Sequence, residues 1–220
     1  MKRIINISLF LVLVLAYSCD KVTEMTSQSY AQSFYSIDFI DYVLQKENNS
    51  ITVCTRGDFV GSLQSKGKEK LKYQNLCEKF NDLSYNKEVR FIMAPTNVFL
   101  AEVITGIDII SDTDFGDDCP AGASLGNIVF IDAYSAYDFV QGGYKSKDPS
   151  DDYSPTNWTR INKRISELGE NDLALAPLHY ITFLSLNFDL IPEEKNHNLT
   201  VTLTLDDGRV LTKTFAMQFE

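Results

Sequence analysis

The feature that most constrains the fold is a period-two alternation of apolar and polar residues near the end of the sequence. From Leu199 to Leu205, leucine and valine alternate with threonine, and between Leu211 and Phe219 most odd-numbered positions are apolar. Successive side chains of a strand point to opposite faces, so the pattern predicts two strands that each bury one face. Asp207-Gly208 lies between them and favours a type I′ hairpin turn, because both residue types tolerate a positive φ.

The strand signal recurs along much of the chain. Aromatic and β-branched residues are frequent from 34 to 44, where Tyr35, Ile37 and Phe39 alternate with polar neighbours. We expect Tyr180 to Phe188 to be another strand of the C-terminal sheet. Further strands are predicted at 51–55, 89–93, 98–110 (with Gly106 at a bulge or turn) and 127–132, and a loop is predicted at 112–126.

Helical spacing is found in fewer places. Tyr73, Leu76, Cys77 and Phe80 recur every three or four residues among lysines and glutamates, which predicts an amphipathic helix over 67–83. Short helices are also predicted at 133–140 and 155–168, the second capped by Thr156 or Asn157 and ended by Gly169.

Six or more short strands with few long helices favour a mainly β domain. We expect an Ig-like or transthyretin-like β-sandwich with a few short helices, and an α+β fold is the alternative. Residues 33–220 would form this single globular domain. The segment 20–32 is polar and rich in Ser, Thr and Gln, which predicts a flexible tether in front of the domain.

The first residues have the form of an export signal. Lys2 and Arg3 are followed by an apolar run from Ile4 to Ala16, which is shorter than the roughly 20 residues that span a bilayer. A positive start and a short apolar core are typical of a secretory signal. The run ends in Leu-Ala-Tyr-Ser-Cys19, which resembles a lipobox.

The lipobox implies a covalent lipid anchor. In lipoproteins the cysteine receives a diacylglycerol thioether, the chain is cut before it, and the new amine is acylated, often with palmitate. We therefore predict a signal peptide at 1–18, and a lipidated Cys19 that begins a tether at 19–32. Each buried CH₂ contributes about 0.8 kcal/mol, so two or three acyl chains would hold the protein durably on the outer membrane, on its periplasmic or cell-surface side.

The net charge of −10 limits the partners. An acidic protein repels phosphate backbones, so no nucleic-acid partner is expected. Beyond the membrane, a protein or a glycan is the expected partner. No CxxC or Cys/His cluster is present, so we expect neither a structural zinc site nor a cofactor. Cys54, Cys77 and Cys119 allow either one disulfide with one thiol or three buried thiols.

The lipobox, the polar tether and a β domain that ends in a threonine-rich hairpin resemble small uncharacterised lipoproteins of Bacteroidota. The segment Asp112-Thr-Asp-Phe-Gly-Asp-Asp-Cys-Pro-Ala-Gly-Ala-Ser-Leu-Gly-Asn127 is also similar to a pattern of that group. The resemblance implies a location in the cell envelope. It implies no known activity and assigns no catalytic residue.

Gly122-Ala-Ser124-Leu-Gly126 matches the G-x-S-x-G motif of α/β-hydrolases. That motif needs a strand that turns sharply into a helix and exposes the serine beside an oxyanion hole. Here an acidic loop precedes the motif and a strand-like run follows it. His179 and His197, the two histidines of the sequence, have no recognisable partner setting. We therefore interpret the motif as a glycine-bearing loop and predict no catalytic residue.

Four aspartates in the 112–126 loop are weak candidates for a cation site, because alternating carboxylates suit Ca²⁺. The order of residues departs from that of an EF-hand, since Gly116 comes one place early and Ala123 stands where the glutamate belongs. A solvated acidic loop is therefore the expected state, with no metal. The candidates are Asp112, Asp114, Asp117 and Asp118.

Exposed aromatic residues could stack on sugars, although most aromatic side chains fill the core. Trp158 lies in a polar stretch and Tyr144 in a glycine-rich loop, so these two are the weak ligand-binding candidates. The leading hypothesis is a non-enzymatic envelope lipoprotein whose β domain presents a surface to a protein or glycan. The alternative is a hydrolase of polysaccharide or ester that uses the Ser124 loop or paired acids.

Overall fold

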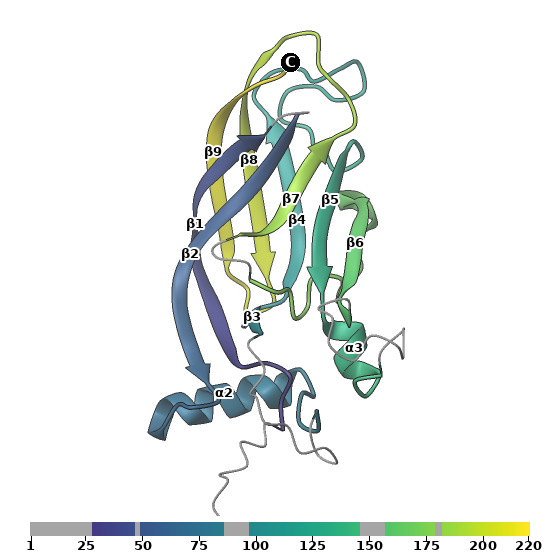
Figure 1. Cartoon of the computed structure of the whole chain (residues 1–220). Coiled ribbons are helices and arrows are strands. Elements are labelled where there is room, and N and C mark those ends of the chain that lie inside the picture. Colours follow the sequence, from purple (N-terminus) through teal and green to yellow (C-terminus); the bar gives the residue numbers. More distant parts are fainter. Residues whose placement is uncertain (1–27, 47–48, 86–96, 146–156, 179–181) are drawn as a thin grey trace, which may run out of the picture.

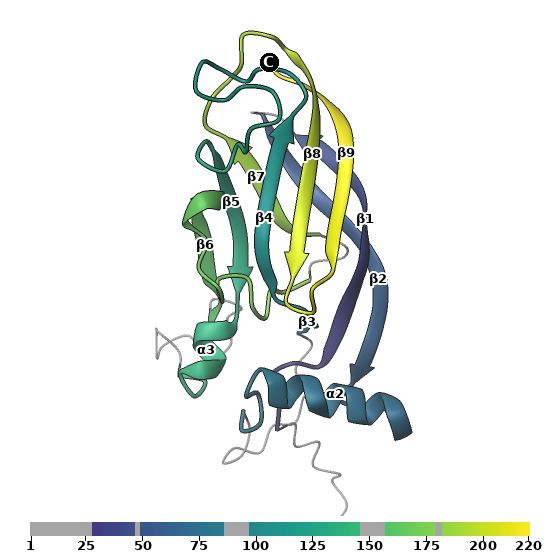
Figure 2. The same ribbon diagram turned by 180° about the vertical axis from the view of Figure 1, so that it is seen from behind.

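The computed structural model describes residues 28–46, 49–85, 97–145, 157–178 and 182–220. The fold is mainly β, with two sheets packed against each other and a few short helices (Figures 1 and 2). The prediction of a β-sandwich with few helices is therefore confirmed. The predicted signal peptide, Cys19 and the strand at 89–93 lie outside the described residues.

The larger sheet contains β1 (Ser33–Lys46), β2 (Ser50–Ser62), β3 (Val98–Leu100), β5 (Val129–Ser135), β6 (Thr159–Arg164) and β7 (Thr182–Phe188). Their order across the sheet is β3-β1-β2-β7-β5-β6. β3 runs parallel to β1, and every other neighbouring pair is antiparallel.

The smaller sheet contains β4 (Ile104–Ser111), β8 (Asn196–Leu205) and β9 (Val210–Gln218), in the order β4-β8-β9. The predicted C-terminal hairpin is confirmed. The strand predicted at 98–110 is wrong as a single element, because β3 ends at Leu100 and β4 begins at Ile104 in the other sheet, but the register shift between Ile104 and Gly106 is the expected bulge. The predicted type I′ turn is wrong, because Gly208 has a φ of 87° but Asp207 is not in the positive-φ region. The hydrogen bonds between Leu205 and Arg209, and from Gly208 N to Leu205 O, instead enclose a three-residue loop with glycine in the left-handed position.

The helices within the described residues include α2 (Gly67–Lys79), α3 (Tyr137–Gln141) and the short 3₁₀ helix η2 (Ile165–Glu167). α2 and α3 lie at one end of the sandwich, which we call the α2 end (Figure 1). The predicted helix at 67–83 is confirmed but ends at Lys79. The helix predicted at 133–140 begins only at Tyr137, because residues 133–135 complete β5.

The helix predicted over 155–168 is wrong, because this segment forms β6 and η2, and its proposed cap Thr156 lies outside the described residues. Its polar composition suits an edge strand, in which only Ile161 is buried and Arg160 forms a two-pronged ion pair with Asp132 on β5 (both contacts 2.8 Å). β7 also differs from expectation, since it joins the larger sheet between β2 and β5.

Two hydrophobic cores hold the fold together. The first fills the space between the sheets and contains the alternating apolar residues of β8, among them Leu199 and Val201. The second lies at the α2 end and is rich in aromatic residues from β1, α2 and β3, including Phe34, Tyr73 and Phe99. The end of the predicted tether belongs to this second core, because Tyr30 and Ala31 are buried. The folded domain therefore includes residues before the predicted boundary at 33.

The described residues include no helix that is both long enough and apolar enough to cross a membrane.

Candidate functional site

The candidate site results from a difference in length between the two sheets. The tip of the β8–β9 hairpin reaches β1 at Ile37, whose carbonyl accepts a hydrogen bond from Arg209 Nη1 (2.5 Å). The same guanidinium pairs with the buried carboxylate of Glu102 (2.5 Å). β1 and β2 continue beyond this tip toward α2 (Figure 1). The inner face of the larger sheet is therefore left without a partner sheet over its last few residues.

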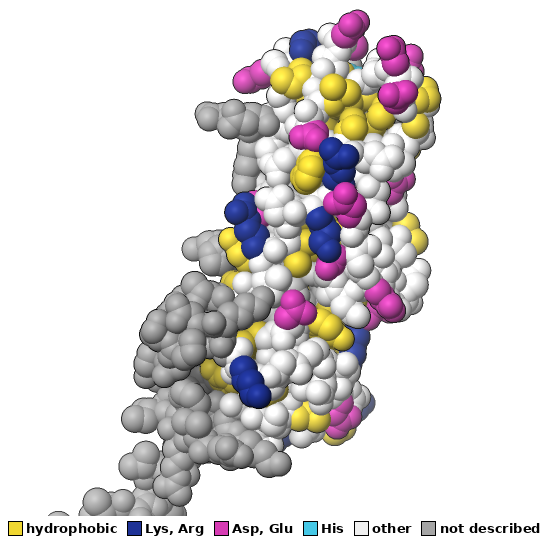
Figure 3. All heavy atoms as spheres, turned by 90° about the vertical axis from the view of Figure 1, so that its right-hand side faces the viewer, with side chains coloured by type: hydrophobic (Ala, Val, Ile, Leu, Met, Phe, Trp, Pro, Cys, Tyr) yellow, Lys and Arg dark blue, Asp and Glu magenta, His cyan; other side chains and the backbone are white. Residues whose placement is uncertain are grey.

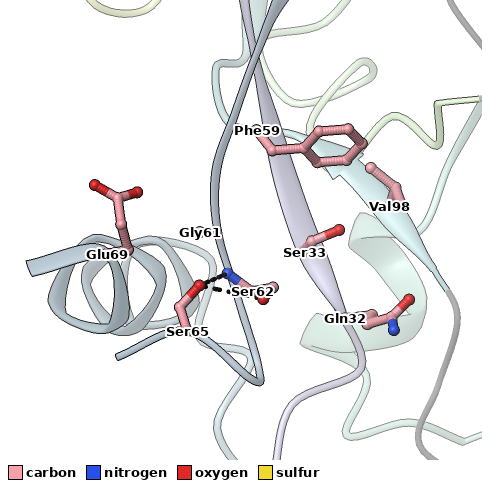
Figure 4. A pocket seen from close by; sticks show the side chains of 8 residues that line it. All are labelled: Gln32, Ser33, Phe59, Gly61, Ser62, Ser65, Glu69 and Val98. Atoms are coloured by element: carbon pink, nitrogen blue, oxygen red, sulfur yellow. Dashed lines mark hydrogen bonds between the residues drawn. The ribbon is translucent and has the colours of Figure 1, made fainter. Parts of the chain in front are cut away.

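A hollow of about 510 Å³ lies on this uncovered part of the sheet (Figure 4). Its volume falls within the range of about 300–1,000 Å³ that is typical of small-molecule sites. We call it the Phe59 hollow, and it is lined by Gln32, Ser33, Phe59, Gly61, Ser62, Ser65, Glu69 and Val98.

A β-bulge places Phe59 in the hollow. Phe34 pairs with Gly61 and Tyr35 pairs with Phe59, so Val60 is an extra residue on β2. The bulge turns Phe59 to the face of Tyr35, while Gly61 faces α2 on the opposite side. The Phe59 side chain is 64% exposed, and its ring meets Tyr35 edge-on with centroids 5.5 Å apart. The Phe59 ring therefore contacts Tyr35 along one edge and remains largely open to solvent.

Hydroxyl groups and one amide lie beside the ring. Ser62, Ser33 and Val98 form one row across β2, β1 and β3, because Ser33 pairs with both neighbours. Ser65 Oγ accepts a hydrogen bond from Ser62 N at 2.9 Å, and the two serine hydroxyl oxygens are 3.2 Å apart. Gln32 precedes Ser33 and is half-buried. In Figure 4 the side chains of Phe59, Ser33, Gln32 and Val98 lie on one side of β2.

The carboxylate of Glu69 does not face the Phe59 side of the hollow, although Glu69 is one of the lining residues. Figure 4 shows it on α2, on the other side of β2 from Phe59, and its carboxylate pairs with Lys72 (3.0 Å). β2 packs directly on α2 at Gly61, because a Cβ at this position would come within 2.6 Å of the backbone carbonyl oxygen of Glu69. We therefore assign the hollow an aromatic, hydroxyl and amide character without a formal charge of its own.

The two aromatic candidates from the sequence lie elsewhere. Trp158 is half-buried, donates from Nε1 to the Tyr30 hydroxyl (3.1 Å) and meets Phe99 edge-on. Tyr144 donates its hydroxyl to Asp82 (2.9 Å), and burial raises its pKa. Both rings complete the second core, so neither has the exposed surface that was expected of it.

Ser124 does not occupy a nucleophile elbow. It follows a loop, forms an isolated bridge with Ile110 on β4, and donates its hydroxyl to Asp108 (2.6 Å). His197 is bonded to other groups: its Nδ1 is 2.7 Å from Ser111 Oγ and its Nε2 donates to the carbonyl of Glu194 (2.8 Å). His179 lies outside the described residues.

Two aspartates of the acidic loop accept hydrogen bonds from other residues of the protein. Asp112 accepts from the backbone and side chain of Asn198 (2.9 and 2.6 Å), which lowers its pKa. Asp114 accepts from Ala121 N (2.7 Å), and Asp117 and Asp118 are exposed. Within the described part of the chain, no group of three or more His, Cys, Asp or Glu side chains is placed to hold a metal ion.

The three cysteines adopt one of the two arrangements that the sequence allowed. Cys54, Cys77 and Cys119 are buried, and none of them forms a disulfide. Burial raises the pKa of the Cys77 thiol to about 11, so it stays protonated and unreactive at neutral pH.

Comparison with protein-family models, with curated protein sequences and with solved structures finds no match to this chain. The assignment of a site therefore rests on geometry. Sequence analysis missed Phe59 because it ended the predicted strand at Thr55, whereas β2 continues to Ser62. The available signal was the pair Phe59-Val60, two β-favouring residues that resume the pattern after Arg56-Gly57-Asp58.

Proposed function

We propose that this chain is a lipid-anchored protein of the bacterial outer membrane and a non-enzymatic module that binds a neutral glycan in the Phe59 hollow. The anchor is supported by the charged start, the short apolar run and the lipobox that ends at Cys19. The resemblance to small lipoproteins of Bacteroidota supports the same location. The observation that carries the ligand assignment is the exposed ring of Phe59, which meets Tyr35 edge-on and lies on the same side of β2 as Ser33 and Gln32 (Figure 4).

A sugar ring suits this combination of groups. A pyranose presents a face of C–H bonds, which are attracted to the negative face of an aromatic ring. Its hydroxyl groups both donate and accept hydrogen bonds, as do serine hydroxyls and a glutamine amide. The hydroxyl groups of Ser33 and Ser62 and the amide of Gln32 therefore match the edge of a sugar while Phe59 supports its face.

The charge of the protein favours a neutral sugar over an anionic one. The net charge is −10, so the molecule as a whole repels phosphorylated and uronic-acid polymers. A role without catalysis is supported by Ser124, whose hydroxyl donates to a carboxylate, and by His197, which is bonded to Ser111 and Glu194.

The ligand assignment is tested by calorimetric titration of the full-length protein in detergent. The probes are soluble tetrasaccharides of glucose, mannose, xylose and N-acetylglucosamine. We expect at least one to bind, and Phe59→Ala to weaken its binding about tenfold or more, as loss of one stacking ring does elsewhere. Phe59→Tyr retains the ring and should preserve binding.

The matched control is Phe39→Ala, which removes a 47% exposed ring from β1 outside the hollow. It should leave the affinity unchanged. The assignment fails if none of the four probes binds, or if Phe39→Ala and Phe59→Ala weaken binding equally.

A separate experiment tests the anchor: cells fed a clickable palmitate should label the wild-type protein and not Cys19→Ala. Protease digestion of intact and lysed cells then distinguishes the surface from the periplasmic side.

A further inference from the structure

A second surface lies at the end of the sandwich opposite α2. Two loops form it: the 112–126 loop after β4 and the 189–195 loop between β7 and β8. They touch each other, because a Cβ at Gly116 would lie 3.4 Å from Leu190 Cδ2. Both loops emerge at the end of the molecule where the C-terminus also lies (Figure 1). We call this the loop-end surface.

A fully buried aromatic ring supports the two loops from below. Phe115 of the first loop stacks on Phe188, the last residue of β7, with centroids 5.7 Å apart, and meets Phe219 edge-on at 5.1 Å. The second loop is held at both ends, by Asp189 N bonded to Ile128 O and by His197 Nε2 bonded to Glu194 O. A surface fixed in this way loses little conformational entropy on binding.

Two adjacent apolar side chains project from the fixed second loop. Leu190 is 43% exposed and Ile191 is 49% exposed, whereas the next residue, Pro192, is buried. Single exposed apolar residues are ordinary on a protein surface, but a neighbouring pair on a rigid loop offers a contact that a partner can bury.

The surroundings of this pair are acidic. Asp117, Asp118 and Glu193 are exposed, and Asp189 is exposed beside its ion-pair partner Arg164. The two loops contain one cation, Lys195. Figure 3 shows hydrophobic side chains gathered at this end of the molecule with acidic side chains around them.

We propose that the loop-end surface docks a protein segment that carries an apolar side chain flanked by lysine or arginine. The apolar pair would bury the partner's apolar anchor, and the acidic rim would attract and orient its cations. A basic protein segment fits better than an anionic membrane or a nucleic acid, because the rim repels both. This proposal does not rest on glycan binding, since it uses the opposite end of the molecule.

The test uses fluorescence anisotropy with the full-length protein in detergent and a labelled octapeptide that alternates lysine with leucine. Octapeptides of lysine with serine and of glutamate with leucine are the comparison probes. We expect the lysine–leucine peptide to bind best. The double variant Leu190→Ser/Ile191→Ser should weaken its binding about tenfold or more, since both apolar contacts are lost.

Removal of acidic charge should change both the affinity for the peptide and the dependence of that affinity on salt. Asp117→Asn/Asp118→Asn should weaken binding several-fold and reduce its dependence on salt, as loss of rim charges does. Val210→Ser is the matched control, because Val210 is 58% exposed but lies at the hairpin tip at the other end. It should leave the affinity unchanged.

Three outcomes would overturn the proposal. The first is equal binding of the lysine–serine peptide, which would indicate charge attraction alone. The second is unchanged affinity in Leu190→Ser/Ile191→Ser. The third is self-association that this double variant abolishes, which would assign the apolar pair to a second copy of the chain. Binding of tetrasaccharides at Phe59 should persist in every variant of this set, so failure of one proposal leaves the other intact.

Discussion

The two ends of the sandwich differ in the burial of the aspartates compared here. At the α2 end Asp82 is fully buried and accepts hydrogen bonds from Tyr30 N (2.7 Å), Ala31 N (2.8 Å) and the Tyr144 hydroxyl. At the loop end Asp117 and Asp118 are exposed. A carboxylate is thus a structural clasp at one end and part of a solvated rim at the other.

The difference arises from where the backbone needs partners. The segment of Tyr30 and Ala31 crosses the second core without a neighbouring strand for its N–H groups, and a buried N–H needs an acceptor. Asp82 supplies that acceptor just after α2. The 112–126 loop satisfies much of its own backbone, for example through Phe115 N to Cys119 O and Gly122 N to Ser111 O. Its remaining carboxylates are therefore available to solvent or to a partner.

The largest expected effect is at the base of the loop end. Phe115→Ala should lower the free energy of unfolding by about 4 kcal/mol, because a fully buried ring is replaced by a cavity. Urea unfolding followed by circular dichroism measures the change. Phe39→Ala, which removes an exposed ring, should cost less than about 1 kcal/mol. Similar losses in both variants would show that the loop end has no rigid base.

The next effect is at the clasp of the α2 end. Asp82→Ala should lower the free energy of unfolding by about 3 kcal/mol, since it leaves two buried backbone N–H groups without their acceptor. Asp82→Asn retains one acceptor oxygen and should cost about half as much. Urea unfolding again provides the measurement, and Asp118→Ala at the exposed rim is the matched control. An Asp82→Ala protein as stable as that control would contradict the clasp.

The sequence predicted the β architecture because its strongest patterns lie where burial follows strand alternation. In β8, Leu199, Val201 and Leu203 are all buried, as the period of two requires. β1 departs from that rule: a register shift between Ile37 and Phe39 turns Phe39 outward and brings Ile40 into the core. Bulges depend on cross-strand pairing, which no local pattern contains.

The candidate sites were harder to predict for the same reason. Phe59 is exposed because of a bulge and because the smaller sheet ends early, and both depend on tertiary structure. Trp158 looked exposed in its polar neighbourhood, but that neighbourhood is an edge strand beside the second core. The acidic loop at 112–126 was predicted correctly as a loop, because its glycines, proline and aspartates form turns wherever they lie.

The contribution of an aspartate to the free energy of unfolding should change with pH in opposite directions at the two ends. Burial raises the pKa of Asp82 in the folded protein above its usual value of 3.8. Its contribution to stability is therefore full below pH 3.8 and is lost as the pH rises through the raised pKa. The difference in unfolding free energy between wild type and Asp82→Asn should shrink as the pH rises.

Asp112 should show the opposite slope. The side chain and backbone of Asn198 lower the pKa of Asp112 below 3.8, so its contribution is present above that pH and is lost as the pH falls through the lowered pKa. The difference between wild type and Asp112→Asn should grow as the pH rises. Urea unfolding at a series of pH values from about 3 to 7 measures both slopes, and slopes of equal sign would remove the electrostatic contrast between the ends.

The smallest expected effect belongs to the residue that looked most like a nucleophile. Ser124→Ala removes an exposed hydroxyl that donates to Asp108 (2.6 Å), so it should change the free energy of unfolding by less than about 1 kcal/mol. It should also leave both tetrasaccharide binding at Phe59 and peptide binding at the loop end unchanged, because its hydroxyl donates to Asp108 and belongs neither to the Phe59 hollow nor to the Leu190–Ile191 pair and its acidic rim. The informative control is a hydrolysis assay with nitrophenyl esters and glycosides on wild type and variant. An activity present in the wild type and lost in a folded Ser124→Ala would show that the protein is a hydrolase and not only a binding module. It would also place the reaction beside the loop end.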